Sequence, residues 1–191
     1  MTGILKAGRG LALQPLCLRD ASALASLVDT NRERLRRWLP WVDDNHTKTD
    51  SRAYIRRMRT LAKQGLACPY GLWWEKRLVG VVGFTWIDEA NRSAGIGYWL
   101  AEEAEGHGLM TAAVTALLRH GFRTLQLNRI ELRAGVRNRR SRAVAERLGF
   151  RHEGTLRQGE HLYDRFVDHA VYGLLAEEWQ RIRALTRVAR R

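Results

Sequence analysis

A strand, a glycine turn and a helix follow one another between Ile96 and Phe122, and this stretch constrains the fold more than any other. Its first five residues, IGYWL, form a short apolar and aromatic run typical of a β-strand. The polar segment AEEAEGHG follows and contains Gly106 and Gly108. Apolar residues then recur at helical spacing, which predicts a helix with one face packed on a sheet: Met110, Ala113, Val114, Leu117, Leu118 and Phe122.

A helix that starts after glycines exposes free backbone N–H groups and the positive end of its dipole, and such a place can hold a phosphate group. The alternative is a tight connection with no ligand. Two common nucleotide loops are excluded. No Gly-Lys-Ser/Thr sequence is present, and the segment from Gly106 to Gly108 lacks the third glycine of a dinucleotide fingerprint. A pyrophosphate-binding turn without a lysine or metal-binding carboxylates remains.

The stretch EGHGLMTAAVTALLRHGF and the downstream segment from Asn128 to Leu174 carry a family resemblance. They resemble the coenzyme A core of the GCN5-related N-acetyltransferase (GNAT) superfamily, and more narrowly its RimJ/RimL-like branch, which acetylates the N-termini of ribosomal proteins. The most specific run is Asn138–Phe150, and the similarity extends from about Leu11 to Trp179. The resemblance implies an α+β fold with a central mixed, mostly antiparallel, splayed β-sheet flanked by helices.

One loop position departs from the family pattern. The family's loop usually reads Arg/Gln-x-x-Gly-x-Gly/Ala, whereas this chain has Glu105 first, Gly108 fourth and Met110 sixth. A carboxylate at the first position would lie near a diphosphate, so we expect the Glu105 side chain to turn away from it. The branch tolerates a larger residue such as Met110 at the sixth position.

Length and composition indicate one domain that covers residues 1–191, with a core of about 11–179 and a basic C-terminal helix over 177–191. No apolar run approaches the roughly 20 residues of a membrane span, and the N-terminus lacks the apolar core of a signal peptide. Cys17 and Cys68 have no metal or redox spacing, which favours free thiols in a reducing cytoplasm.

The net charge of +13 is unevenly distributed. The tail over 181–191 has five arginines and no acid, and we interpret it as a solvated helix end. A second cluster comprises Arg129, Arg133, Arg137, Arg139, Arg140 and Arg142. Nucleic acid, an acidic protein substrate, a polyphosphate cofactor or plain solvation could each account for such charge. A nucleic-acid-binding module is the alternative from a different functional class, but the chain lacks a recognition-helix pattern or paired RNA-stacking aromatics.

The remaining elements are predicted from the spacing of apolar residues and from the capping, glycine and proline residues that bound them. A first strand over 10–18 precedes a helix that Asp20 caps, that breaks near 29–31 and that ends at Pro40. Asp50 or Thr49 caps a second helix, which Gly65 closes. Further strands are expected at 70–75, 78–88, 90–100, 129–136, 150–161 and 166–175, and further helices at 140–149 and 176–191. The order is β-α-α-β-β-β-α-β-α-β-β-α.

The resemblance implies a set of residues that bind acetyl-CoA. The turn would hold the diphosphate through backbone N–H groups, and the preceding strand would offer its edge to the pantetheine arm and a backbone N–H to the thioester carbonyl. The first turn of the helix at Asn138 would lie near the cofactor. The predicted residues are Tyr98, Trp99, Leu100, Glu105, Gly106, His107, Gly108, Leu109, Met110, Thr111, Asn138 and Ser141.

Two residues are predicted to be catalytic on the same grounds. Ser141 would protonate the departing thiolate, although a serine in a first helical turn is also ordinary. Glu160 would act as general base, through a water, although a glutamate at a strand end is usually just solvated. An α-amino group has a pKa near 7.8 and lysine near 10.4, so deprotonating lysine at neutral pH costs about 3.5 kcal/mol more. A single modest base therefore suits an N-terminal amine.

The acceptor is predicted to meet Trp38, Trp41, Tyr163 and Glu160. For the two tryptophans, a hydrophobic plug between helices is the alternative. The expected acceptor is the N-terminus of a protein, such as an acidic ribosomal protein, and the alternative is a small amine or an aminoacyl compound. None of the six histidines pair at metal-ligand spacing, so no metal is assigned. The branch commonly forms dimers, and a homodimer is expected by analogy only.

Overall fold

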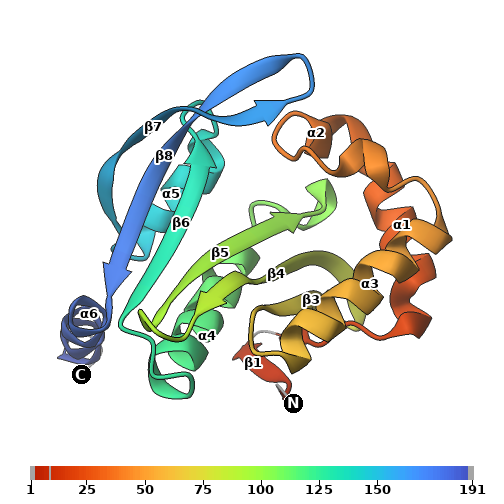
Figure 1. Ribbon diagram of the computed structural model, residues 1–191. Coiled ribbons are helices and arrows are strands. Elements are labelled where there is room, and N and C mark those ends of the chain that lie inside the picture. Colours follow the sequence, from red (N-terminus) through yellow and green to blue (C-terminus); the bar gives the residue numbers. More distant parts are fainter. Residues whose placement is uncertain (1–2, 9, 189–191) are drawn as a thin grey trace.

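The computed structural model describes residues 3–8 and 10–188. One eight-stranded sheet runs in the order β1-β2-β3-β4-β5-β6-β8-β7 (Figure 1). All neighbouring strands are antiparallel except β5 and β6, which are parallel. The strands are β1 (Leu5–Gly8), β2 (Leu11–Gln14), β3 (Cys68–Trp74), β4 (Arg77–Asp88), β5 (Ser93–Leu100), β6 (Arg129–Gly135), β7 (Arg151–Leu162) and β8 (Arg165–Leu175).

Helices cover both faces of the sheet, which gives the expected α+β class (Figure 1). One buried cluster joins α4 and α5 to the sheet, and a second joins the helices of the first third of the chain to β3 and β4. The helices are α1 (Ala21–Thr30), α2 (Arg32–Arg36), α3 (Lys48–Lys63), α4 (Leu109–Arg123), α5 (Arg139–Arg147) and α6 (Ala176–Val188). Three short 3-10 helices are η1 (Leu18–Asp20), η2 (Val42–Asp44) and η3 (Glu102–Ala104).

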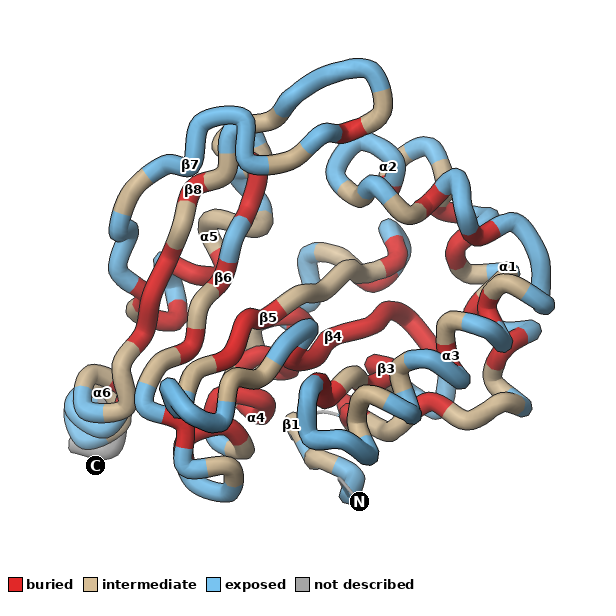
Figure 2. Tube along the Cα trace, in the orientation of Figure 1, coloured by how far each residue is buried: buried red, intermediate tan, exposed pale blue. Residues whose placement is uncertain are grey.

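The helix α4 packs at the centre of the larger cluster, and its apolar stripe is buried as its spacing predicts. Gly121 allows the close approach, because a Cβ there would lie 2.8 Å from the Phe84 ring and 2.9 Å from Ile130. The two-residue period of a strand puts Ile130 and Leu132 on one face of β6 and Arg133 on the other, and accordingly the first two are buried and Arg133 is exposed. Figure 2 shows this buried centre and the exposed tip of the β7–β8 hairpin.

The strands β5 and β6 separate partway along their length. They pair only from Ser93 to Ile96 on β5 and from Arg129 to Leu132 on β6. Beyond these residues β5 stays with β4 as far as Leu100, and β6 stays with β8 as far as Gly135. Figure 1 shows the two strands diverging toward their C-terminal ends. The sheet is therefore splayed, as the resemblance implies, and each strand presents an unpaired edge to the opening.

The N-terminal part differs from the sequence-based expectation in three places. The first strand ends at Gln14, because Pro15 cannot donate to the sheet, and β1 was not predicted. Asp20 does not cap α1 through its side chain; its carboxylate accepts the Cys17 N–H at 2.7 Å. Thr47, rather than Thr49 or Asp50, is the N-cap of α3, and Asp50 completes the capping box at the third helical position.

The helix boundaries elsewhere are close to the prediction. The first long helix breaks at Asn31, within the predicted 29–31, and its second part, α2, ends at Arg36 rather than at Pro40. Gly65 and Gly149 follow α3 and α5 with φ of +75° and +82°, where glycine is the least strained residue. The predicted basic C-terminal helix corresponds to α6, and residues 189–191 of that prediction lie outside the described part of the chain.

Candidate active site

The turn between β5 and α4 leaves the backbone amides at the N-terminus of α4 open. Gly106 and Gly108 have φ of +79° and +72°, and Gly108 is the N-cap of α4. The Ala112 N–H bonds the Gly108 carbonyl at 3.1 Å, so the amides of the residues between them project from the helix end. A Cβ at either glycine would meet no atom within 4 Å, so there is space in front of the turn. The turn can hold a diphosphate through backbone N–H groups.

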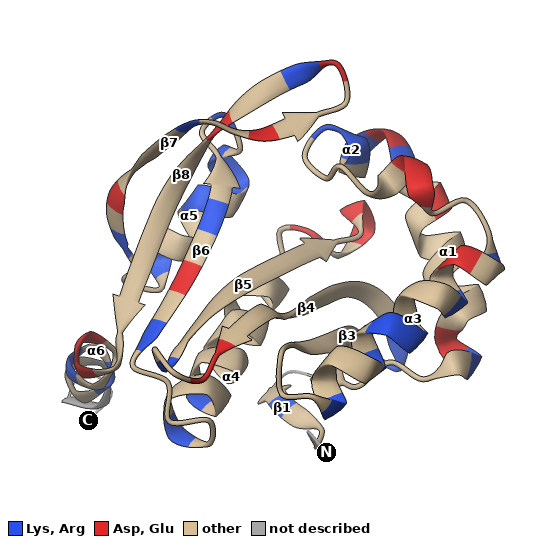
Figure 3. Cartoon of the chain, viewed as in Figure 1, with Lys and Arg blue, Asp and Glu red and all other residues tan. Residues whose placement is uncertain are grey.

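Two arginines form ion pairs with the carboxylate of Glu105, the residue that departs from the family pattern. Arg34 on α2 approaches one oxygen at 2.5 Å, and Arg140 on α5 pairs with the other. Figure 3 shows this acidic segment at the end of β5. The negative charge that would oppose a diphosphate is therefore neutralised by residues from two other elements. This is how the chain accommodates a glutamate at that position.

Arg34 also ties α2 to the end of β5, an arrangement that sequence reasoning missed. Its guanidinium donates to the Leu100 carbonyl and to Asn31 Oδ1 at 3.3 Å. Asn31 Oδ1 in turn accepts the Glu102 N–H at 2.8 Å. The only signal in the sequence was an Asn and an Arg three residues apart at the predicted helix break. These contacts hold the C-terminal end of β5 and the start of the turn against α2.

The free edge of β5 presents two backbone amides to the opening. The Ala101 N–H bonds the Val79 carbonyl at 2.7 Å, so Ala101 faces β4. Backbone groups alternate along a strand, so Trp99 also faces β4 while Tyr98 and Leu100 face the opening. The Leu100 carbonyl is already taken by Arg34. The N–H groups of Tyr98 and Leu100 are therefore the candidates that could bind an amide or a thioester carbonyl there.

Ser141 lies beside Tyr98, across the opening from α5 to β5. The two hydroxyl oxygens are 3.0 Å apart, and the Tyr98 hydroxyl also donates to the Ser141 carbonyl at 3.1 Å. Asn138 caps α5 by accepting the Ser141 N–H at 3.2 Å, which fixes the position of the serine. Burial raises the pKa of Tyr98 to about 12, so the phenol is protonated at neutral pH. The phenol has one proton, which it donates to the Ser141 carbonyl, so its oxygen can accept the proton of the Ser141 hydroxyl.

Glu160 lies on the opposite face of the sheet, where α1–α3 lie. It is paired with Val167 on β8, and its Oε2 is 3.3 Å from Nε2 of His169. The Trp38 ring covers Gly135 on the same face, with ring carbons 3.5 Å from where a Cβ would be. Gly135 pairs with His169, so Trp38, His169 and Glu160 line one region at the end of β6. His169 was not among the predicted site residues.

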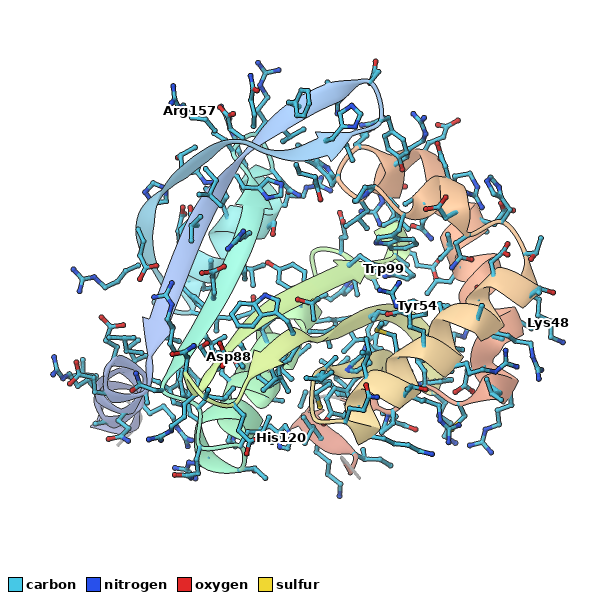
Figure 4. The ribbon with its side chains drawn as sticks, viewed as in Figure 1. Lys48, Tyr54, Asp88, Trp99, His120 and Arg157 are labelled. Carbon is cyan, nitrogen blue, oxygen red and sulfur yellow. The ribbon has the colours of Figure 1, made fainter. Side chains whose placement is uncertain are left out.

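The tip of the β7–β8 hairpin is docked on the segment that follows α2. The Tyr163 hydroxyl donates to the Leu39 carbonyl at 2.7 Å, and the Arg36 guanidinium lies 3.8 Å from the centre of the Tyr163 ring. Trp41 lies 6.1 Å from Trp99, which Figure 4 shows at the end of β5. Tyr163 thus holds the hairpin against the segment with both predicted acceptor tryptophans. Its predicted contact with the acceptor stays a prediction.

The opening between β5 and β6 joins the two faces that carry the predicted catalytic residues. Tyr98 belongs with the cluster of α4 and α5, and Trp99, its neighbour on β5, belongs with the cluster of α1 and α3. Ser141 therefore reaches the opening from one face, and Glu160 stands on the other. An acceptor on the face of Glu160 and a leaving group on the face of Ser141 would meet at the opening.

His107, in the glycine turn, packs against Trp74, with ring centres 5.0 Å apart.

Other functions find less support in the geometry. Within residues 3–8 and 10–188, no group of three or more His, Cys, Asp or Glu side chains could hold a metal ion. No helix over the same residues is long and apolar enough to cross a membrane. Arg129 and Arg133 in the predicted basic cluster are paired with Glu131 and Glu153. This pairing reduces the free positive charge that a nucleic-acid-binding surface needs.

Comparisons with known proteins agree with this geometry. The model of the acetyltransferase (GNAT) domain family matches residues 10–151. A putative ribosomal N-acetyltransferase, YdaF, of Bacillus subtilis (strain 168) is 36% identical over 180 residues, which are 92% of this chain and 96% of YdaF. The structure of RimL, a ribosomal L7/L12 alpha-N-protein acetyltransferase in complex with coenzyme A, superimposes with a TM-score of 0.89 at 29% identity, covering 92% and 99% of the two chains.

A third similar protein is not named as a ribosomal-protein acetyltransferase. The microcin C7 self immunity acetyltransferase MccE, solved in complex with acetyl-CoA and AMP, superimposes with a TM-score of 0.86 at 27% identity. The overlap covers 92% of this chain and 97% of MccE. RimL and MccE thus share this fold, and their structures contain coenzyme A and acetyl-CoA, respectively.

Proposed function

The chain belongs to the acetyltransferase (GNAT) family and uses acetyl-CoA as its donor, and on this basis we propose that it acetylates the N-terminal α-amine of a ribosomal protein. The observation that carries the proposal is the opening between β5 and β6, with Tyr98 and Ser141 on one face and Glu160 and Trp38 on the other. The names of the two ribosomal-protein acetyltransferases above support this acceptor class.

The turn and the edge of β5 hold the donor in this proposal. The backbone N–H groups of Gly106, Gly108 and the first turn of α4 would hold the diphosphate, with Asn138 and His107 nearby. Acetyl-CoA supplies the acetyl group as a thioester, and the Tyr98 and Leu100 amides face the opening where its carbonyl would lie. A preorganised backbone donor of this kind is typically worth ~3 kcal/mol in the transition state.

Proton transfer is divided between the two faces. Glu160 accepts a proton from the acceptor ammonium, either directly or through a water, so that the amine is neutral when it attacks. Ser141 Oγ, 3.0 Å from the Tyr98 hydroxyl, donates a proton to the departing sulfur and takes a proton back from solvent before the next turnover. The acceptor reaches Glu160 between Trp38, Trp41 and the docked hairpin of Tyr163. Attack occurs directly, with donor and acceptor bound together.

The chemistry of the acceptor follows from the strength of this base. A single half-buried carboxylate can deprotonate an α-amine with pKa near 7.8 far more readily than a lysine near 10.4. The net charge of +13 also favours association with an acidic acceptor by electrostatic steering. We further propose that the enzyme works in the cytoplasm and forms a homodimer, which size-exclusion chromatography with light scattering checks.

Mass spectrometry of a peptide panel tests the acceptor. Peptides with free N-termini, the same peptides with a blocked N-terminus and an internal lysine, and small amines with and without a nucleotide moiety are incubated with acetyl-CoA and enzyme. The proposal expects acetylation only of the free α-amines. Modification of the small nucleotide-bearing amines alone would instead favour an acceptor of the kind that the MccE complex suggests.

A further inference from the structure

The pair formed by Glu160 and His169 has no role in the proposed function beyond the carboxylate itself. Oε2 of Glu160 and Nε2 of His169 are 3.3 Å apart, and the side chains are 27% and 16% exposed. They come from neighbouring strands, and a register irregularity on β7 between Leu156 and Glu160 brings the carboxylate alongside the imidazole. Both side chains are mostly shielded from solvent and lie within reach of each other.

Glu160 is the charged side chain that lies next to His169. Opposite His169, β6 supplies Gly135, which has no side chain, and β7 supplies Leu156. The segment after α2 supplies Trp38, which lies over Gly135. The next charged side chain on this face of β6 is Arg133, and Glu131 holds it at 2.6 Å. Among residues 3–8 and 10–188, Glu160 alone lies within ion-pair distance of His169.

We propose that His169 is a positioning residue that relays the proton which Glu160 removes from the acceptor amine. The inference rests on Glu160 as the base of the proposed function. The N–H bond of the ammonium breaks as an O–H bond forms on Glu160. That O–H bond then breaks as the proton moves to the lone pair of His169 Nε2, and the carboxylate is restored beside an imidazolium. The imidazolium afterwards returns its proton to water.

The relay answers a problem that a half-buried carboxylate has on its own. A carboxylic acid formed in the site must lose its proton to solvent before the next turnover. An imidazole binds a proton about 100-fold more tightly than a carboxylate, judging from their ordinary titration near pH 6.5 and 4.3, so the transfer is downhill. The relay can accept another proton from Glu160 only after the imidazolium has released its own.

The pH dependence of kcat/KM tests the relay. Wild type is expected to lose activity on the acid side, and His169→Gln is expected to move this acid limb to lower pH with a roughly tenfold lower plateau. The matched control is His161→Gln. His161 is adjacent to Glu160 on β7 and packs on Phe166 at 4.8 Å, and consecutive strand residues point to opposite faces. An acid limb of His169→Gln that overlays that of wild type overturns the relay.

Ring ¹⁵N shifts of His169, followed against pH in the absence of substrates, give a readout that needs no activity. In Glu160→Gln the transition of these shifts is expected to move to lower pH, because the anionic partner of the imidazolium is gone. An unmoved transition would overturn the pairing. Activity separates the two proposals: full activity of Glu160→Gln removes the base itself, whereas an inactive Glu160→Gln with an unaltered His169→Gln profile removes only the relay.

Discussion

Glu105 and Arg34 form an ion pair at 2.5 Å between the start of the glycine turn and α2, two segments far apart in the sequence. The side chains are 26% and 22% exposed, so the pair is shielded from much of the solvent. Arg140 closes the other side of the carboxylate. A residue that looks unfavourable beside a diphosphate is thus the link that joins α2, the turn and α5.

Replacing Glu105 by Gln should separate stability from donor binding. The loss of a charged partner for the half-buried Arg34 should lower the free energy of unfolding by about 1–3 kcal/mol, which for a chain of this size lowers the Tm by roughly 3–10 °C. The added net positive charge beside the turn should lower the KM for acetyl-CoA several-fold. Thermal unfolding and initial rates measure the two effects.

Glu103→Gln is the matched control for Glu105→Gln, because Glu103 is an exposed residue of η3, the 3-10 helix that ends just before Glu105. It should leave both the Tm and the KM for acetyl-CoA close to wild type. A higher KM in Glu105→Gln would mean that the carboxylate shapes the turn rather than opposes the diphosphate.

Gly108→Ala should weaken donor binding through backbone strain. Gly108 has φ of +72°, and a Cβ there has free space, so the cost comes from the left-handed conformation and is about 1 kcal/mol. We expect a Tm lower by roughly 2–4 °C and weaker coenzyme A binding by calorimetry. Gly3→Ala is the control, since Gly3 also has open space and does not have a positive φ. Equal affinities in both variants would argue against a ligand on the turn.

Ser141→Ala should lower kcat by roughly 10- to 100-fold and change coenzyme A affinity little. The serine hydroxyl lies 3.0 Å from the Tyr98 hydroxyl, whereas Asn138 caps α5 through the Ser141 backbone, which alanine retains. Stopped assays of thiol release give kcat, and calorimetry gives the affinity. An unchanged kcat would remove Ser141 from the mechanism.

Stability at high pH should depend on Tyr98. Burial raises its pKa in the folded protein to about 12, against an ordinary value of 10.0. A raised pKa stabilises the folded state fully below pH 10 and loses this contribution as the pH rises toward 12. Between pH 10 and 12, the free energy of unfolding of Tyr98→Phe should therefore fall less steeply with pH than that of wild type. Tyr54, also raised to about 12 by burial, is present in both proteins and cancels. Parallel curves would contradict the burial of the phenol.

Local patterns were sufficient to predict the elements that carry the site. The turn at Gly106 and Gly108, the burial of α4 and the alternation on β6 each depend on residues close together in the sequence. The cap of α3 was misplaced by two or three residues, because Thr47, Thr49 and Asp50 all have suitable side chains and only the geometry distinguishes them. The strand β1 was missed, because it is only four residues long and pairs with β2 alone at the edge of the sheet.

Contacts across the sheet were beyond sequence reasoning. The extent of the splay depends on where β5 and β6 stop pairing, which neither strand specifies by itself. The partners of Glu105 lie on α2 and α5, so no local pattern points to them. His169 and Glu160 are near in sequence, but the irregular register of β7 decides that they meet. The chemistry-bearing residues were thus predicted singly, and their partners came from the fold.

Site of acetylation, measured by mass spectrometry on peptides with one free α-amine and one internal lysine, tests the account most directly. Wild type with acetyl-CoA should modify the α-amine, and Glu160→Gln should do so at least 100-fold more slowly at neutral pH. Acetylation of the lysine in preference to the α-amine, or an equal rate for Glu160→Gln, would contradict it.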